Sequence, residues 1–240
     1  MTIIPAILPK TRDELIEKLS LLRSVGFTGR VQIDICDGKY VDSKTWPFAN
    51  ELNNTQTSVE LMGTLRNDED LQKLLSDFKI DLDLMVMESE SKMMIWNMFH
   101  PDRIIIHLDS IVDKDELGEL FNLGDQIDVI SRKAIVLAFS LDTDIESFSY
   151  WYDNFNMRSV QIMGIEHVGH QGQEFSDRTL DYIQVLKARY SDITIMVDGG
   201  VSLETVNRLN EYGVAEAVAG SAVFKNDEIL NNILELERML

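Results

Sequence analysis

Short apolar runs rich in β-branched residues alternate along the chain with longer amphipathic segments. Runs of this kind bounded by turn residues are typical of buried strands, whereas apolar residues at intervals of three or four are typical of helices. We expect strands at 3–8, 30–35, 80–86, 103–108, 133–139, 159–165, 193–198 and 215–220. We expect helices at 11–25, 67–78, 88–99, 113–123, 143–154, 176–190, 202–212 and 226–239.

Capping residues support two of these helices. Thr11 precedes the first helix, whose first turn carries acidic residues, and Gly26 follows it. Ser202 is a candidate cap for the seventh helix and Gly213 a candidate stop. Hydroxyl residues before a helix and glycine after it are the expected boundary signals.

Eight strand–helix pairs in 240 residues predict a single (β/α)8 TIM barrel over residues 1–240. A doubly wound open sheet is the alternative, because periodicity does not report closure. Residues 36–66 are too long for an ordinary strand–helix loop, which indicates an insertion at about 49–66. Within it, 57–62 is a candidate extra strand.

Composition narrows the class of protein. The chain has 22 Lys and Arg against 41 Asp and Glu, a net charge of −19. Nucleic acids and anionic membrane surfaces require clustered cations, so neither is an expected partner. A single cysteine, Cys36, excludes an internal disulfide and a cysteine-based zinc site. No signal segment and no bilayer-spanning run is evident, which predicts a cytoplasmic protein.

Candidate chemistry gathers at the carboxyl ends of the predicted strands, where barrel enzymes place their active sites. Gln32 and Asp34 are two residues apart and share one face of the second strand. Asp83 and Asp198 lie in similarly apolar contexts. Buried carboxylates are costly unless paired, hydrogen-bonded or bound to metal, so they are candidate site residues. The alternative is that each caps a helix or accepts hydrogen bonds from loop amides.

Two glycine turns suggest a phosphate site. Gly199-Gly200 follows the seventh strand and Gly220-Ser221 the eighth. Loops at these two positions form the common phosphate site of TIM barrels, because glycine lets backbone N–H groups approach phosphate oxygens.

The polar segment 166–173 follows the sixth predicted strand. Several other polar residues also follow predicted strands. Asp37, His107 and Asp109 are such residues, without an assigned role. His100 is expected to be structural, His167 and His170 to lie at the surface, and Cys36 to be a packing residue.

At these positions the chain resembles the ribulose-phosphate 3-epimerase family. The matching segments occur in the family's order and cover nearly the whole chain apart from the insertion. They are Pro5-Ala-Ile-Leu8, Ile33-Asp-Ile-Cys-Asp-Gly38 with Tyr40-Val41, Leu82-Asp-Leu-Met-Val86, Ile106-His107, Met163, Gly169 with Gly172-Gln-x-Phe175, Val197-Asp-Gly-Gly-Val201 and Ala219-Gly-Ser-Ala-Val-Phe224.

The resemblance implies a (β/α)8 barrel that interconverts ribulose 5-phosphate and xylulose 5-phosphate. It implies that Asp34 and Asp198 are the two acid–base residues, on opposite faces of the substrate. It assigns the phosphate contacts to Gly172, Gly199, Gly200, Gly220 and Ser221, and substrate-facing sulfur side chains to Met85 and Met163.

The sequence departs from the family pattern at the metal ligands. The family binds its metal through two histidines and the two aspartates, and the histidine positions are Gln32 and Asp83 here. A ligand set of Gln32, Asp34, Asp83 and Asp198 contains oxygen alone, which favours Mg²⁺, Mn²⁺ or Ca²⁺ over Zn²⁺. A site without metal, in which one aspartate is protonated, is the alternative.

Other departures bear on the substrate. The family's serine in the first strand is Ala6, one of its methionines is Cys36, and the sixth loop is one residue longer.

The leading hypothesis is therefore a sugar-phosphate 3-epimerase, an isomerase with a small sugar phosphate as its partner. Two alternatives remain: a sugar-phosphate lyase or decarboxylase on a related barrel, and a non-catalytic sugar-phosphate-binding barrel. The decarboxylase-like relatives carry lysine where this chain has Cys36. Whether the chain forms a homo-oligomer is left open.

Overall fold

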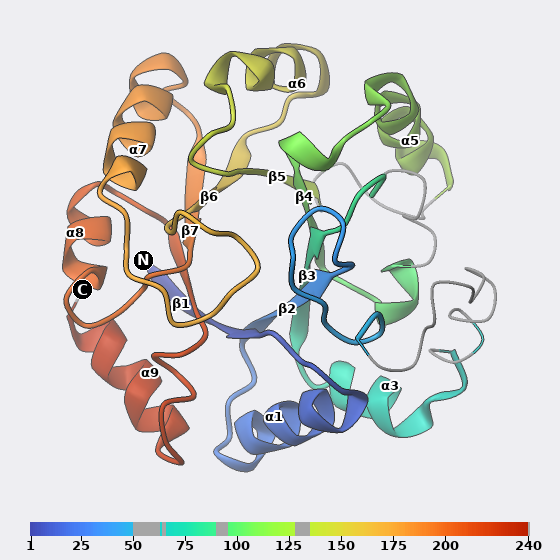
Figure 1. The fold of residues 1–240 in the computed structure, drawn as a ribbon, viewed down its shortest axis with the longest axis vertical. Helices are drawn as coiled ribbons and strands as arrows, with labels where there is room; N and C mark the ends of the chain where they lie inside the picture. The colour runs from blue at the N-terminus through green and yellow to red at the C-terminus, as the bar shows by residue number, and fades with distance from the viewer. Residues whose placement is uncertain (50–62, 64–65, 90–95, 128–134, 240) are drawn as a thin grey trace. The chain divides into compact units, whose positions relative to one another are not determined.

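The computed structural model describes residues 1–49, 63, 66–89, 96–127 and 135–239. In this part of the chain, eight strands form a closed barrel in the order of the sequence, β1 to β8 (Figure 1). The strand pairs with a defined register are parallel. The predicted TIM barrel is confirmed, and the alternative of an open sheet is wrong.

The chain divides into two compact units. Unit 1 consists of Met1–Ala6, His107–Asp109 and Val136–Leu240, and unit 2 of Ile7–Ile106 and Ser110–Ile135.

Unit 2 carries the helices and strands of the first half of the barrel. They are α1 (Arg12–Ser24), β2 (Arg30–Cys36), α3 (Glu69–Leu75), β3 (Lys79–Met85), the 3-10 helix η2 (Asn97–Phe99), β4 (Arg103–His107, up to Ile106) and α5 (Lys114–Ile127). The Thr11 cap is confirmed, because its Oγ1 accepts the Glu14 N–H at 3.1 Å. Leucines 15, 19 and 22 of α1 are buried.

Helices α1 and α3 are joined by a charged pair. Asp68 caps α3, where its carboxylate accepts the Leu71 N–H at 3.2 Å. The same carboxylate accepts a hydrogen bond from Arg12 Nη2 at 2.5 Å and another from Arg12 Nε. One side chain therefore both begins α3 and holds the start of α1.

The amino-terminal ends of β2, β3 and β4 are closed by a buried ion cluster. Asp81 is fully buried, and its carboxylate pairs with Arg30 and with Arg103, whose Nη2 lies 2.5 Å from Oδ2. In TIM barrels this end supports stability, while the carboxyl ends carry the active site. This cluster was not among the features predicted from the sequence.

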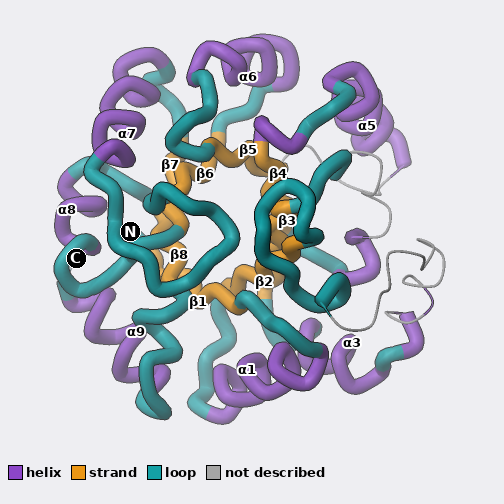
Figure 2. The backbone as a smooth tube through the Cα atoms, in the orientation of Figure 1, coloured by secondary structure: helices purple, strands orange, loops and turns teal. Residues whose placement is uncertain are grey.

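Unit 1 carries the remaining elements. They are β1 (Thr2–Ile7, up to Ala6), η3 (Leu108–Ser110, up to Asp109), β5 (Ile135–Phe139, from Val136), η5 (Ile145–Phe148), α6 (Ser149–Phe155), β6 (Ser159–Met163), α7 (Arg178–Arg189), β7 (Thr194–Asp198), α8 (Val206–Glu211), β8 (Glu216–Ala219) and α9 (Ile229–Arg238). In this unit α7, α8 and α9 lie outside the layer formed by β6, β7 and β8 (Figure 2).

Some predicted boundaries differ from the structure. The helix expected at 202–212 begins at Val206. Ser202 instead starts a turn, in which its Oγ accepts the Glu204 N–H at 3.2 Å and Thr205 Oγ1 donates to the Gly200 carbonyl at 2.8 Å. Side-chain bonds to local backbone thus compete with helix formation here.

Two predictions fall on residues outside the described part. They are the insertion at about 49–66 with its candidate strand 57–62, and the middle of the helix expected at 88–99. Among the residues that are described, none of the helices has the length and apolarity that crossing a membrane requires.

Candidate functional site

In unit 2, three predicted site residues lie together on β2 and β3. Asp34 is in register with Asp83, and Gln32 precedes Asp34 by two residues on the same face. Gln32 Nε2 donates to Asp34 Oδ1 at 2.8 Å and lies 3.5 Å from Asp83 Oδ2. All three residues are buried. The glutamine amide therefore offers N–H groups to both carboxylates.

The chemistry of this set suits a hard cation. Neighbouring buried carboxylates repel each other unless a hydrogen-bond donor, a proton or a cation lies beside them. Carboxylate and amide oxygens are the ligands that Mg²⁺ and Mn²⁺ prefer, while the nitrogen ligands typical of Zn²⁺ are missing from Gln32, Asp34 and Asp83.

Two sulfur side chains lie next to these acids. Cys36 is in register with Met85, and their sulfur atoms are 3.9 Å apart. Burial is the main cause that raises the pKa of the Cys36 thiol to about 12. Cys36 is therefore a neutral, buried side chain, which agrees with the expected packing role.

In unit 1, Asp198 ends β7 beside two residues of β6. Met163 is in register with Asp198. The Gln161 amide Nε2 lies 3.5 Å from Asp198 Oδ2 and 4.0 Å from Met163 Sδ. Asp198 is 8% exposed and Gln161 is fully buried.

Gln161 was not among the predicted site residues, although the sequence carries a signal for it. The tripeptide Val31-Gln32-Ile33 of β2 recurs as Val160-Gln161-Ile162 in β6. In each copy a glutamine lies between two apolar residues of a buried strand and faces an aspartate.

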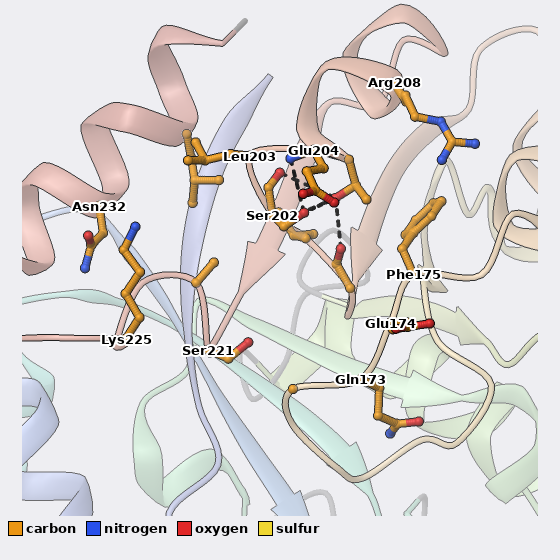
Figure 3. Close-up of a pocket in the computed structure, with 16 residues that line it drawn as sticks. Gln173, Glu174, Phe175, Ser202, Leu203, Glu204, Arg208, Ser221, Lys225 and Asn232 are labelled. Atoms are coloured by element: carbon orange, nitrogen blue, oxygen red, sulfur yellow. Dashed lines mark hydrogen bonds between the residues drawn. The ribbon is translucent and has the colours of Figure 1, made fainter.

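Unit 1 also contains a pocket of about 690 Å³ at the carboxyl ends of its strands (Figure 3). Three residues predicted to contact phosphate line it: Gly172, Gly200 and Ser221. Two cationic side chains, Arg208 and Lys225, belong to its lining as well. Gly199 and Gly220 lie in the same two turns without being part of the lining.

The sixth loop, which connects β6 to α7, packs directly against the turn at Gly199-Gly200. Gly200 has φ +67°, and a Cβ built on it would lie 2.6 Å from Phe175 Cα. A Cβ on Gly164 would lie 2.1 Å from the Gly199 carbonyl oxygen. The Ser176 N–H donates to the Gly164 carbonyl at 2.8 Å. Glycine is required at both positions because backbone occupies the space of a side chain.

The tip of the sixth loop is held differently. The Gln173 amide donates to the carbonyls of His167 and, at 3.1 Å, of His170. Both histidine side chains are exposed, as expected. At the base of the loop, Glu166 pairs with Arg178 at 2.8 Å.

Other polar residues near the strand ends have structural partners. The Asp37 carboxylate accepts the N–H groups of Lys39 at 2.8 Å and of Tyr40 and Met87 at 3.2 Å. The Asp37 carboxylate therefore has a structural role, in which it accepts hydrogen bonds from loop amides. Asp109 accepts hydrogen bonds from the hydroxyls of Ser140 and Thr143.

Comparisons with known proteins agree with this architecture. The model of the ribulose-phosphate 3 epimerase family matches residues 2–224. A ribulose-phosphate 3-epimerase of Helicobacter pylori is 25% identical over 233 residues, which cover 95% of this chain and 93% of that protein. The ribulose-phosphate 3-epimerases of Schizosaccharomyces pombe and Chlamydia trachomatis are each 32% identical to this chain over the matched residues. Those two matches cover 40% and 53% of this chain, and only 43% and 53% of the relatives' own lengths.

Solved structures of other barrels share the fold. A 3-hexulose-6-phosphate synthase from Salmonella typhimurium superposes with a TM-score of 0.65 at 12% identity, covering 100% of this chain and 98% of that one. A 3-keto-L-gulonate-6-phosphate decarboxylase from Vibrio cholerae gives 0.63 at 12% identity, covering 100% and 96%. At such identities the likeness concerns the fold alone. The family match, by contrast, extends over nearly the whole sequence, and the chain belongs to the ribulose-phosphate 3-epimerase family.

Proposed function

We propose that this protein is an isomerase that inverts C3 of a ketose phosphate, with ribulose 5-phosphate and xylulose 5-phosphate as the first candidates. One observation carries the proposal. The two aspartates that match the family's acid–base pair, Asp34 and Asp198, are both present and buried, each in the carboxyl-terminal half of its strand and beside a glutamine amide. Binding alone does not require such a pair.

The reaction explains why two acids are needed. The C3 proton is acidified by the neighbouring keto group, so a positioned carboxylate can remove it and leave an enediolate. Inversion then requires a second acid that delivers a proton to the opposite face. Asp34 and Asp198 fill these two roles, and they exchange them when the reaction runs in reverse.

The pocket in unit 1 would hold the phosphate group. Gly172, Gly200 and Ser221 line it, and Lys225 is a cationic residue of the same lining. Amides fixed in turns bind phosphate without the entropic cost of ordering long side chains.

A divalent cation would be held by oxygen ligands. The ligands proposed from the family's pattern are Gln32, Asp34, Asp83 and Asp198. When bound, the cation would stabilise negative charge on the enediolate oxygens. In this ligand set Mg²⁺ or Mn²⁺ is favoured over Zn²⁺.

The alternatives receive less support. A decarboxylase or lyase shares the fold, but Cys36, at the position of the lysine in those relatives, is a buried neutral thiol. A non-catalytic binder would account for the changed metal ligands but leaves the two buried aspartates without a purpose.

Proton NMR in D₂O tests the proposal. Chelator-treated protein is incubated with ribulose 5-phosphate, alone and with Mg²⁺, Mn²⁺ or Zn²⁺. We expect loss of the C3 proton signal and growth of xylulose 5-phosphate, fastest with Mg²⁺ or Mn²⁺. Absence of exchange under every condition would exclude this substrate and redirect the search to other sugar phosphates and to the binding hypothesis.

Two variants separate the roles of the acids. Asp34→Asn retains only Asp198, and Asp198→Asn retains only Asp34. We expect neither to interconvert the epimers, while each still exchanges the C3 proton of the one epimer that its remaining acid faces. Interconversion by both variants would contradict the two-acid mechanism.

A further inference from the structure

Gln161 is a polar side chain at a fully buried position of β6. It is 0% exposed, between the apolar residues Val160 and Ile162. It precedes Met163 by two residues and so shares its face, and Met163 is in register with Asp198. The side chain therefore lies one layer deeper in unit 1 than the proposed acid.

Burial of a primary amide at this position is costly. Transfer of an amide from water to an apolar environment is unfavourable unless the amide is hydrogen-bonded. Leucine or methionine would fill a similar volume without that cost. One contact of the amide is with the carboxylate of Asp198, whose Oδ2 lies 3.5 Å from Nε2.

The other proposed acid has a closely similar neighbour. In unit 2, Gln32 Nε2 donates to Asp34 Oδ1 at 2.8 Å. Gln32 reaches its aspartate along the same strand, whereas Gln161 reaches Asp198 from the adjacent strand. Each acid thus meets a glutamine N–H from the deeper layer.

We infer that Gln161 is a positioning residue that holds Asp198 for proton transfer at C3. The inference rests on the proposed function. An aspartate carboxylate rotates about two side-chain bonds, and an N–H group on Oδ2 restricts that rotation. The other oxygen is then left to accept the C3 proton, while the electrons of the C–H bond stay in the enediolate. Misplacement of a reacting group by about 1 Å can cost roughly a hundredfold in rate.

Substrate isotope effects test this role. Gln161→Met replaces the amide by an apolar side chain of similar length. Both epimers are prepared with deuterium at C3, and the isotope effect on kcat/KM is measured for each. The epimer that exchanges in Asp34→Asn is the one whose proton goes to Asp198.

We expect kcat to fall roughly tenfold to a hundredfold with little change in KM. For the epimer that faces Asp198, the isotope effect should rise, because transfer to Asp198 becomes rate-limiting. For the opposite epimer the isotope effect should fall toward unity. Asp34 removes the deuteron of that epimer, and this step no longer limits the rate once proton delivery by Asp198 has become slow. A general loss of structure would not move the two isotope effects in opposite directions.

Gln184→Met is the matched control. Gln184 lies on the exposed side of α7, where its amide donates to Tyr212 Oη at 3.2 Å. We expect this variant to keep the wild-type rate and isotope effects. If Gln161→Met does not fold, Gln161→Asn is used instead. Its side chain is one methylene shorter, which moves the amide away from Asp198, and the same two isotope effects are measured.

The outcomes separate the two proposals. Wild-type turnover with unchanged isotope effects in the Gln161 variant overturns the positioning role alone. A wild-type protein that exchanges no C3 proton with any tested sugar phosphate overturns the proposed function, and this inference with it.

Discussion

Gln32 and Asp83 place an amide and a carboxylate, rather than imidazole rings, beside Asp34 on β2 and β3. Both positions carry histidine in the family, so the two changes replace nitrogen by oxygen and leave the aspartates in place. Because Gln32 Nε2 donates to Asp34, the amide also supplies a hydrogen bond that a metal-bound imidazole nitrogen could not supply.

Restoring both histidines is expected to change the preferred metal. The double variant Gln32→His, Asp83→His recreates a set of two nitrogens and two carboxylates, which suits Zn²⁺. We expect its affinity for Zn²⁺ relative to Mn²⁺ to rise at least about tenfold, measured by competition with a calibrated chelator. Gln32→Leu is the control, since it removes one ligand without adding nitrogen. An unchanged preference in the double variant would show that these positions do not contact the ion.

Among the elements, α1 and α3 depend on one carboxylate. The hydrogen bond from Arg12 is the main cause that holds the pKa of Asp68 below its usual range. A lowered pKa in the folded state means that the ionised carboxylate stabilises the fold at neutral pH. That contribution is present above the ordinary aspartate pKa of about 4 and is lost as the pH falls through the lower folded value.

Asp68→Asn isolates this charge, because asparagine still caps a helix. We expect the variant to lose about 1 kcal/mol of unfolding free energy at pH 7, in the upper range for a partly exposed pair. At pH 3 the difference from wild type should shrink, which urea unfolding at both values will measure. Asp77→Asn is the control, since its pair with Arg23 is exposed and should contribute almost nothing. A difference that is as large at pH 3 as at pH 7 would assign the effect to capping.

The elements also show what could be predicted from the sequence. The barrel followed from the alternation of apolar runs and amphipathic segments, because that pattern directly reflects burial on two faces. Boundaries set by local side-chain bonds did not, as the turn at Ser202 shows. The mutual placement of Gln32, Asp34 and Asp83 could be anticipated because strand alternation and chain order bring them together.

Other parts of the site depend on tertiary contacts that no local pattern reports. Gln161 has the same sequence context as Gln32, yet its partner Asp198 lies on another strand. The Asp81 cluster requires three strands in register before its arginines meet. Asp37 and Asp34 lie only three residues apart near the end of the same strand. Only the folded structure shows that the Asp37 carboxylate accepts hydrogen bonds from loop amides.

At the scale of the whole molecule, the net charge of −19 opposes an anionic substrate. If a sugar phosphate binds, local amides and cations must overcome the long-range repulsion. We therefore expect kcat/KM to rise about twofold to fivefold as ionic strength increases from about 10 to 150 mM, because the screening length falls from about 30 to 8 Å.

The measurement uses a salt whose anion does not compete for a phosphate pocket, such as potassium acetate, with a second salt of the same valence as the control. A decrease in kcat/KM with both salts would show that attraction by residues such as Arg208 and Lys225 outweighs the net charge.

The way the sixth loop is attached has a consequence for divergence. Its base cannot vary freely, since Gly164, Gly200 and Phe175 share the same space. Its tip carries exposed histidines held through backbone carbonyls, so their side chains can change without disturbing the glycine turns. New substrate specificities could therefore arise through substitutions at His167 and His170 that leave the glycine turns unchanged, and descendants of this barrel would be expected to differ first at these two positions.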